Sequence, residues 1–171
     1  MSLFKKKSTV SNETIRYGAK LITVKEPKSV ISEQFRTIRT NISFMGIDRP
    51  IKTLAFTSAN ISEGKSTVTD NIAVVWANAG KRVLLVDADL RRPTLHQTFN
   101  ISNREGLTTI LTSAAAEMDI TNMIKETQIV NLPIFTAGPI PTKPAEWANS
   151  RPMQALIAGI KDNSDADILD V

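Results

Sequence analysis

The residues best suited to chemistry lie in the stretch 57–67, TSANISEGKST, which follows a short apolar run and opens an amphipathic one. Phosphate binding needs a strand that ends abruptly, a loop whose backbone N–H groups turn inward, and a helix whose N-terminus meets negative charge. Residues 54–56 supply the strand, and residues 68–79 have the composition of the helix. The stretch therefore predicts a phosphate-binding loop.

Two side chains of this loop match the needs of a bound nucleoside triphosphate. Lys65 would reach the β- and γ-phosphates, and the Ser66 hydroxyl would ligate Mg²⁺. The glycine pattern is imperfect, because Ala59 stands where the pattern G-x-x-x-x-G-K-[ST] has its first glycine. A serine-rich turn before an ordinary helix is the alternative. The residues expected to bind the nucleotide are Ser62, Glu63, Gly64, Lys65, Ser66 and Thr67.

Carboxylates follow two further apolar runs. The run 83–86 leads into Asp87 and Asp89, and the run 166–169 leads into Asp170. A buried carboxylate at a strand end is costly without a cation, so three such residues argue for a metal ion. We expect Ser66, Asp87 and Asp170 to hold the metal. The expected catalytic residues are Lys65, Asp87 and Asp89.

The elements that must position these residues alternate between strand and helix. Strands are expected at 54–56, 82–86, 131–138 and 166–171, and helices at 68–79, 93–99, 106–111 and 150–160. This alternation predicts an α/β fold, a P-loop NTPase-like, mostly parallel sheet flanked by helices. In such a sheet a ligand lies at the carboxyl ends of the strands, where the loop and the carboxylates would meet.

A further helix is expected before the first strand, over residues 29–46. Apolar residues recur there at spacings of 4, 3, 4 and 3, with Ser29 or Ser32 as the cap and Gly46 at the end. Three charged residues lie at i, i+3 and i+6 along one flank of this helix: Glu33, Arg36 and Arg39. Their spacing alone predicts a salt-bridged face that is exposed to solvent.

Charge is unevenly distributed. Residues 1–50 hold ten Lys and Arg against four Asp and Glu, whereas residues 51–171 hold eleven against thirteen. We expect residues 1–28 to form a basic, flexible leader and residues 29–171 to form one domain. Such a leader is either a solvated tail or a contact for anionic lipid, nucleic acid or an acidic partner. The lack of interleaved aromatic residues argues against nucleic-acid binding.

Composition excludes several other classes of protein. The chain has no cysteine, which excludes disulfide scaffolds, thiolate metal sites and cysteine nucleophiles. No apolar run approaches the length needed to cross a bilayer. His96, the lone histidine, and the tryptophans Trp76 and Trp147 are expected to have structural roles.

Taken together, the motifs resemble a known family. Between residues 20 and 171 the sequence is similar to bacterial tyrosine kinases of the capsule and exopolysaccharide type, in their Gram-positive cytoplasmic form. Each segment alone is a weak signal, but their combination is specific. The segments are SEQFRTIRTN at 32–41, EGKST at 63–67, DADLRRP at 87–93 followed by His96, Asn131-Leu132, and GPIP at 138–141.

This resemblance implies an ATP-dependent protein-tyrosine (auto)kinase that regulates exopolysaccharide or capsule biosynthesis, with ATP and Mg²⁺ as cofactors. It assigns Lys65 and Ser66 to the Walker A loop, Asp87 and Asp89 to the second acidic motif of the family, and Asp170 to Walker B.

The same resemblance implies partners. Glu33, Arg36 and Arg39 match an E-x-x-R-x-x-R element that packs subunits into a ring in relatives. A membrane adaptor of the polysaccharide co-polymerase type is expected to activate the kinase. It would hold the kinase, which has no transmembrane segment of its own, at the inner face of the cell membrane. No nucleic-acid partner is expected.

Two alternative functions stay open. One is a P-loop ATPase switch of the deviant Walker A type, whose hallmark lysine is replaced here by Asn60. The other is a non-catalytic subunit of the kinase ring. The sequence stops one residue after Asp170, where relatives continue with further elements and a tyrosine cluster, and its only tyrosine is Tyr17. We therefore expect a C-terminally incomplete fold: a fragment, a shortened product or an impaired enzyme.

One departure from the family has a local cost. Ile61-Ser62 replaces the Pro-Gly of many relatives. If φ is positive at Ser62, the strain amounts to about 1 kcal/mol.

Overall fold

The computed structural model describes residues 17–48, 50–112, 120–148, 150–160 and 164–171. Its sheet has the order β1-β4-β2-β3, and every pairing between these strands is parallel. The expected α/β fold is thereby confirmed. The strands are β1 (Thr53–Phe56), β2 (Val83–Asp87), β3 (Ile134–Phe135) and β4 (Ala166–Asp170).

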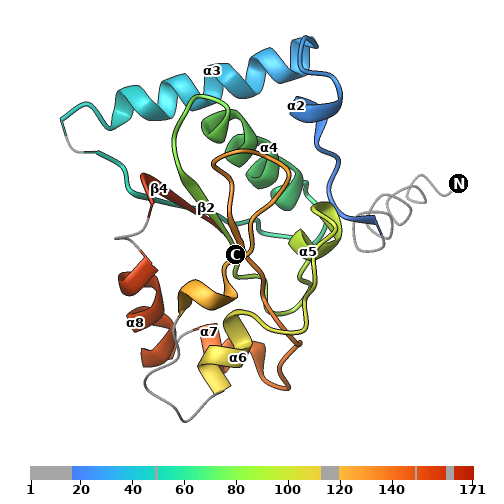
Figure 1. Ribbon diagram of the computed structural model, residues 1–171, viewed down its shortest axis with the longest axis vertical. Helices are drawn as coiled ribbons and strands as arrows, with labels where there is room; N and C mark the ends of the chain where they lie inside the picture. The colour runs from blue at the N-terminus through green and yellow to red at the C-terminus, as the bar shows by residue number, and fades with distance from the viewer. Residues whose placement is uncertain (1–16, 49, 113–119, 149, 161–163) are drawn as a thin grey trace, which may run out of the picture.

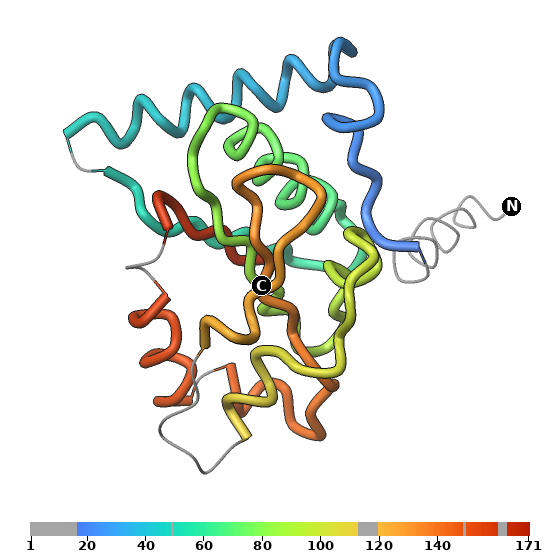
Figure 2. Tube along the Cα trace, in the orientation of Figure 1, coloured from blue at the N-terminus to red at the C-terminus, as the bar shows by residue number. Residues whose placement is uncertain are grey.

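Helices cover the sheet on both faces. In Figures 1 and 2, α3 and α4 lie on one side of the strands, and α6, α7 and α8 lie at the opposite end of the molecule. The short α5 lies beside α4. The helices are α2 (Ile22–Lys25), α3 (Val30–Met45), α4 (Lys65–Ala77), α5 (Leu95–Thr98), α6 (Leu107–Thr112), α7 (Pro144–Ala148) and α8 (Arg151–Ile160), with a 3₁₀ turn at Ile120–Met123.

The hydrophobic core has two layers, one on each face of the sheet. Leu85 and Ile168 point toward α4, where they join Ile72 and Trp76. Their strand neighbours point to the other face and join a second cluster that includes Leu156 of α8. Because both faces are covered, the strands read as continuous apolar runs instead of alternating with polar residues. Trp76 has the packing role predicted for it, and Trp147 packs against the second cluster.

The third strand is shorter than predicted. Residues 131–138 were expected to form it, but only Ile134 and Phe135 pair with β2 in the strand register. Pro133 has no N–H to donate and only accepts, from the Leu85 N–H. Beyond the strand, the carbonyls of Thr136 and Ala137 accept from the N–H groups that start α6. Those carbonyls are therefore used by a helix.

Part of the predicted leader packs against the domain. Residues 1–16 lie outside the described residues, but Ala19 and Thr23 are buried and α2 contacts both α3 and α4. The flexible segment that the sequence suggested over 1–28 therefore does not extend to residue 28.

Helix α3 begins and ends close to the predicted limits. Ser29 is its N-cap, and the Ser29 hydroxyl accepts from the Ser32 N–H. Ser32 itself is buried, and its hydroxyl donates to the Glu26 carbonyl at 2.7 Å. Gly46 follows the last helical residue. Helix α8 has a side-chain cap as well, since the Met153 N–H donates to the Ser150 hydroxyl.

Candidate nucleotide site

The register of the sheet brings the predicted residues to one edge. Asp87 of β2 lies opposite Asp170 of β4, and Asp170 lies opposite Phe56, the last residue of β1. Because all three strands are parallel, the loop after β1 starts beside both carboxylates. Topology alone thus accounts for the meeting of segments more than a hundred residues apart.

The loop after β1 contains two left-handed residues. Ser62 has φ 64° and Gly64 has φ 93°, so the positive φ considered for Ser62 is present. The Glu63 carboxylate accepts from the Asn60 backbone N–H at 3.2 Å and from the Asn60 side-chain amide at 2.7 Å. These contacts hold the loop from within. Glu63 thus has a loop-closing contact instead of lining the cavity described below.

Helix α4 begins at Lys65, almost a turn earlier than the sequence suggested. The first N–H groups of a helix lack intrahelical acceptors and favour an anion, and here they follow directly on the left-handed Gly64. The Lys65 ammonium group is therefore carried by the helix turn that borders the loop.

A cavity of about 1030 Å³ adjoins the loop. This volume lies at the upper limit of the roughly 300–1,000 Å³ that is usual for ligand pockets, which leaves room for a nucleoside triphosphate. Asp89 faces it, whereas Asp87 and Asp170 are wholly buried. The cavity is lined by residues 57–62, 64–67, 88–92 and 94, by Pro144, Ala145 and Ala148 of α7, and by Val171.

Lys65 connects the two acidic elements. Its Nζ lies 3.1 Å from Asp89 Oδ2 and 3.0 Å from Asp170 Oδ1. Burial opposes the charge of the Lys65 ammonium, but Asp170 and Asp89 together outweigh it, so the pKa of Lys65 lies above 10.5. For Asp89, burial is likewise outweighed, by the Arg92 N–H and by Lys65, and the pKa of Asp89 lies below 3.8. Lys65 and Asp89 are therefore both charged.

Asp87 has a different environment. Its Oδ2 accepts from the N–H groups of Thr94 and Leu95, each at 3.1 Å, while its Oδ1 has no hydrogen-bond partner. Burial, followed by the nearby Asp170, raises the pKa of Asp87 to about 8. One oxygen of this carboxylate is thus fixed by the start of α5, and the other is available.

The predicted metal ligands would fit a divalent cation that is coordinated partly by protein oxygens and partly by oxygens of a bound ligand. Asp87 Oδ1 and Asp170 Oδ2 are buried without partners, and Ser66 borders the cavity. Within the described part of the chain, no group of three acidic, His or Cys side chains could hold a metal by itself. Mg²⁺ does not require such a group, because it commonly takes one or two carboxylates with substrate phosphates and water.

Asp70 was not among the site residues predicted from the sequence. This residue of α4 is wholly buried, and neither of its oxygens has a hydrogen-bond partner at bonding geometry. Burial, then Asp170 and Asp87, raises the pKa of Asp70 well above 3.8. The available signal was a carboxylate two residues before the fully apolar stretch 72–77.

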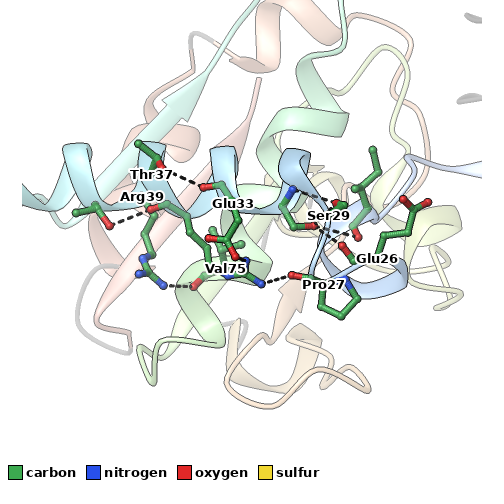
Figure 3. A network of polar contacts seen from close by, with 11 residues as sticks. Glu26, Pro27, Ser29, Glu33, Thr37, Arg39 and Val75 are labelled. Carbon is green, nitrogen blue, oxygen red and sulfur yellow. Dashed lines mark hydrogen bonds and ion pairs between the residues drawn. The ribbon is translucent and has the colours of Figure 1, made fainter.

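The charged residues of α3 lie apart from the strand ends, on the outer side of α4 (Figure 3). Arg36 contacts the Glu33 carboxylate at 2.6 Å and the carbonyl of Pro27. Arg39 Nη1 donates to the carbonyl of Val75, in the last turn of α4, at 3.1 Å. All three residues thus take part in contacts within the chain, and their role in oligomerisation stays a prediction.

His96 lies outside the cavity lining. It is partly buried in α5, and burial followed by Lys125 lowers the pKa of the imidazole below 6.5. Lys125 donates to the carbonyls of Ser102 and Glu105 and to the Thr136 hydroxyl. These neighbours support the structural role expected for His96.

None of the described helices combines the length and apolar character that a membrane crossing requires.

Comparison with known protein families extends these observations. The sequence model of the family described as "AAA domain" matches residues 51–143, just over half of the chain. The tyrosine-protein kinase YwqD of Bacillus subtilis is 45% identical over 145 residues, which are 85% of this chain and 60% of that protein. CapB of Staphylococcus aureus, whose name assigns the same activity provisionally, is 38% identical over 166 residues, 97% of this chain and 68% of that protein. The chain thus spans about two thirds or less of these relatives.

Solved structures agree. The chimerical protein CapA2B2 superimposes with a TM-score of 0.80 at 36% identity, over 95% of this chain and 74% of that one. The septum site-determining protein MinD of Pyrococcus horikoshii, solved with Mg-ADP, gives a TM-score of 0.59 at 26% identity, over 70% of this chain and 48% of that one. The fold is that of P-loop NTPases, and by sequence and structure the chain belongs to the family of bacterial tyrosine-protein kinases.

Proposed function

We propose that the protein is an ATP-dependent protein-tyrosine kinase that regulates capsule or exopolysaccharide biosynthesis. The observation that carries the proposal is the position of Lys65, at the start of the loop helix and paired with both Asp89 and Asp170. Phosphoryl transfer depends mainly on positioning and charge neutralisation, and these residues supply both. The tyrosine-kinase names of the Bacillus and Staphylococcus relatives support the choice of acceptor.

The loop would bind the phosphates of ATP through its inward N–H groups, the start of α4 and Lys65. In the structure, the Lys65 ammonium is neutralised by Asp89 and Asp170. A bound triphosphate would compete for that ammonium and free a carboxylate oxygen. Ser66, Asp87 and Asp170 would then hold Mg²⁺, which supplies charge neutralisation on the phosphate oxygens.

The two residues of the D-x-D pair differ in what they can do for a tyrosine hydroxyl. Asp89 faces the cavity and would orient the hydroxyl, whereas Asp87 is wholly buried and would act through the Mg²⁺ that its free Oδ1 would help to hold. In the transfer, the tyrosine oxygen forms a bond to the γ-phosphorus, the bridging bond to ADP breaks, and the hydroxyl proton passes to the Asp89 carboxylate.

The test is transfer of labelled γ-phosphate from Mg-ATP to a synthetic tyrosine-containing polypeptide, with phosphoamino-acid analysis. Lys65→Met should lower transfer by about 10²-fold or more, because the phosphates lose their main cationic partner. Lys81→Met, at an exposed position after α4, is the matched control and should leave transfer unchanged. Unchanged transfer in Lys65→Met would refute the site assignment.

The likeness to MinD supports one alternative, an ATPase that acts as a switch. Asn60, at the position of the hallmark lysine of that group, favours the kinase. Release of inorganic phosphate without phosphotyrosine, lost in Lys65→Met, would favour the switch. Nucleotide binding with no turnover of either kind would favour a non-catalytic subunit.

The proposal extends to a membrane adaptor that activates the kinase at the inner face of the membrane, and to a homo-oligomeric ring. The charged flank of α3 is the proposed ring contact. Sedimentation velocity with the adaptor segment should show a larger species, which the triple change Glu33→Ala, Arg36→Ala and Arg39→Ala should dissociate. An unchanged sedimentation coefficient in that variant would contradict this contact.

A further inference from the structure

Residues 18–26, here named the strap, run along α5 and α4 before α3 begins (Figure 1). The strap contains α2, and its residues Ala19 and Thr23 are buried. It touches the two helices whose first turns form the candidate nucleotide site. It does so through two separate hydrogen-bonded contacts.

The first contact is made by Asn71, a wholly buried residue of α4. Asn71 Oδ1 accepts from the Thr23 N–H at 2.9 Å and from the Thr23 hydroxyl at 2.8 Å. Asn71 Nδ2 donates to the Lys20 carbonyl at 2.9 Å and to the Thr67 carbonyl at 2.8 Å. One amide therefore ties the strap to the turn of α4 that carries Lys65 and Thr67.

The second contact is made by Thr98, in the last position of α5. Its hydroxyl accepts from the Ala19 N–H at 2.8 Å. Beside it, Gly18 lies so close to the α5 backbone that a Cβ would come within 2.3 Å of the Thr98 nitrogen. The strap is thus seated on the C-terminal end of the same short helix whose N-terminal end holds Asp87.

Helix α5 spans four residues, Leu95–Thr98. A helix this short has no stability of its own and depends on what packs against it. Its first N–H, that of Leu95, and the N–H of the preceding Thr94 fix Asp87 Oδ2. The Thr98 hydroxyl also lies 3.1 Å from the Thr94 carbonyl and so joins the two ends.

We propose that the strap positions both halves of the nucleotide site, with Asn71 acting on the loop helix and Thr98 acting on Asp87. Asn71 and Thr98 are positioning residues, since neither lines the cavity. The inference rests on the proposed function for the role of Asp87. With the strap released, α5 loosens, and Asp87 loses the amide donors that hold it at the strand end.

Two glycines provide a matched pair of variants in the 171-residue chain. Gly18→Ala introduces a side chain at φ +77° where no room exists, so it displaces the strap. Gly80→Ala introduces the same methyl group at φ +85° with no atom within 4 Å. The backbone strain is alike in both, and only Gly18→Ala disturbs the contact with Thr98.

The first measurement is amide hydrogen exchange at Thr94 and Leu95. Gly18→Ala should speed it by about tenfold, the equivalent of losing one hydrogen bond, and Gly80→Ala should leave it unchanged. The affinity for Mg-ADP should fall several-fold in Gly18→Ala alone. Unchanged protection of these amides in Gly18→Ala, or the same acceleration in both variants, would overturn the proposal.

A second pair of variants tests the contact of the strap with α4. Thr23→Val keeps the shape of the side chain but removes the hydroxyl that donates to Asn71, whereas Thr23→Ser keeps the hydroxyl. Mg-ADP affinity should fall in Thr23→Val and be retained in Thr23→Ser. Equal affinities in the two variants would contradict the part assigned to Asn71.

Hydrogen exchange separates this inference from the proposed function. If Gly18→Ala accelerates exchange in α5 but no phosphotyrosine forms in the wild-type chain, the strap proposal is supported and the kinase assignment fails. If phosphotyrosine forms and depends on Lys65, but α5 stays protected in Gly18→Ala, the kinase assignment holds and the strap proposal fails.

Discussion

The carboxylates at the strand ends and the charged residues of α3 are both conspicuous in the sequence, but their surroundings differ. Asp87 and Asp170 at the strand ends are wholly buried, as is Asp70 of α4, and each has at least one oxygen without a hydrogen-bond partner. The Lys65 ammonium is paired with Asp170 and attracts the charge of Asp70 and Asp87. Glu33, Arg36 and Arg39 lie on the outer side of the fold and contact groups of the same chain.

The difference shows how a ligand site can be told from a structural set of charges. Buried polar atoms are nearly always satisfied, so oxygens left without partners imply that something else binds there. An exposed charge that already has a partner in its own chain does not by itself point to a ligand. A motif alone does not distinguish these cases, whereas burial and hydrogen bonding do.

Asp87→Asn should give the largest effect. It should lower phosphotyrosine formation and raise the free energy of unfolding. Asparagine keeps the shape of the side chain but removes the negative charge that would help to hold Mg²⁺. Phosphotyrosine formation should therefore fall by about 10²-fold or more. The circular dichroism spectrum should stay native. A loss of fold that accounts for the lost activity would assign Asp87 to structure instead.

The stability gain of Asp87→Asn should depend on pH. The pKa of Asp87 is raised from 3.8 to about 8, so between these values the folded state holds a proton that the unfolded state has released. The free energy of unfolding of the wild type therefore decreases as pH rises through this window. The difference between Asp87→Asn and wild type should thus be larger at pH 8 than at pH 5, by urea denaturation.

Asp89→Asn is the control for that comparison. The pKa of Asp89 is lowered below 3.8, so its contribution to stability is complete above that value and is lost only as pH falls through the folded pKa. Its effect should differ less between pH 5 and pH 8 than that of Asp87→Asn, because Asp89 does not titrate there and supplies only a lesser part of the raised pKa of Asp87. A difference of equal size in both variants would show that the pH dependence does not arise at Asp87.

On α3, Arg39→Ala should destabilise more than Arg36→Ala. Arg39 donates to the Val75 carbonyl in the last turn of α4. A buried hydrogen bond that involves a charged group contributes about 1.5–3 kcal/mol to stability, which sets the upper limit for this partly buried one. Arg36 pairs with the exposed Glu33, a contact worth roughly 0.3–0.5 kcal/mol. Its hydrogen bond to the Pro27 carbonyl is exposed to solvent and should contribute less than the partly buried bond of Arg39. Chemical denaturation of the monomer measures both. Equal losses in the free energy of unfolding for Arg39→Ala and Arg36→Ala would contradict the difference expected between the two arginines.

The same comparison explains how far the sequence could predict the site. The loop, the alternation of strands and helices, and the strand-end positions of Asp87 and Asp170 follow from local pattern and parallel topology. Asp70 was missed because the pattern of α4 does not show that its one carboxylate is buried near the strand ends. The contact of Arg39 with Val75 and the contacts of Asn71 with the strap depend on how α3 and α2 pack on α4. Sequence spacing does not encode such packing.

Ser62→Gly should give the smallest effect and tests strain within the site itself. Ser62 has φ 64°, a conformation that glycine adopts freely and serine does not. Relief of that strain should stabilise the fold by up to about 1 kcal/mol, reduced by the greater entropy of glycine in the unfolded chain. Asn131 has the same φ of 64°, but asparagine tolerates the left-handed region, so Asn131→Gly should gain less. Both are measured by urea denaturation. A gain in Asn131→Gly as large as in Ser62→Gly would show that the loop before Lys65 carries no strain beyond that of an ordinary turn.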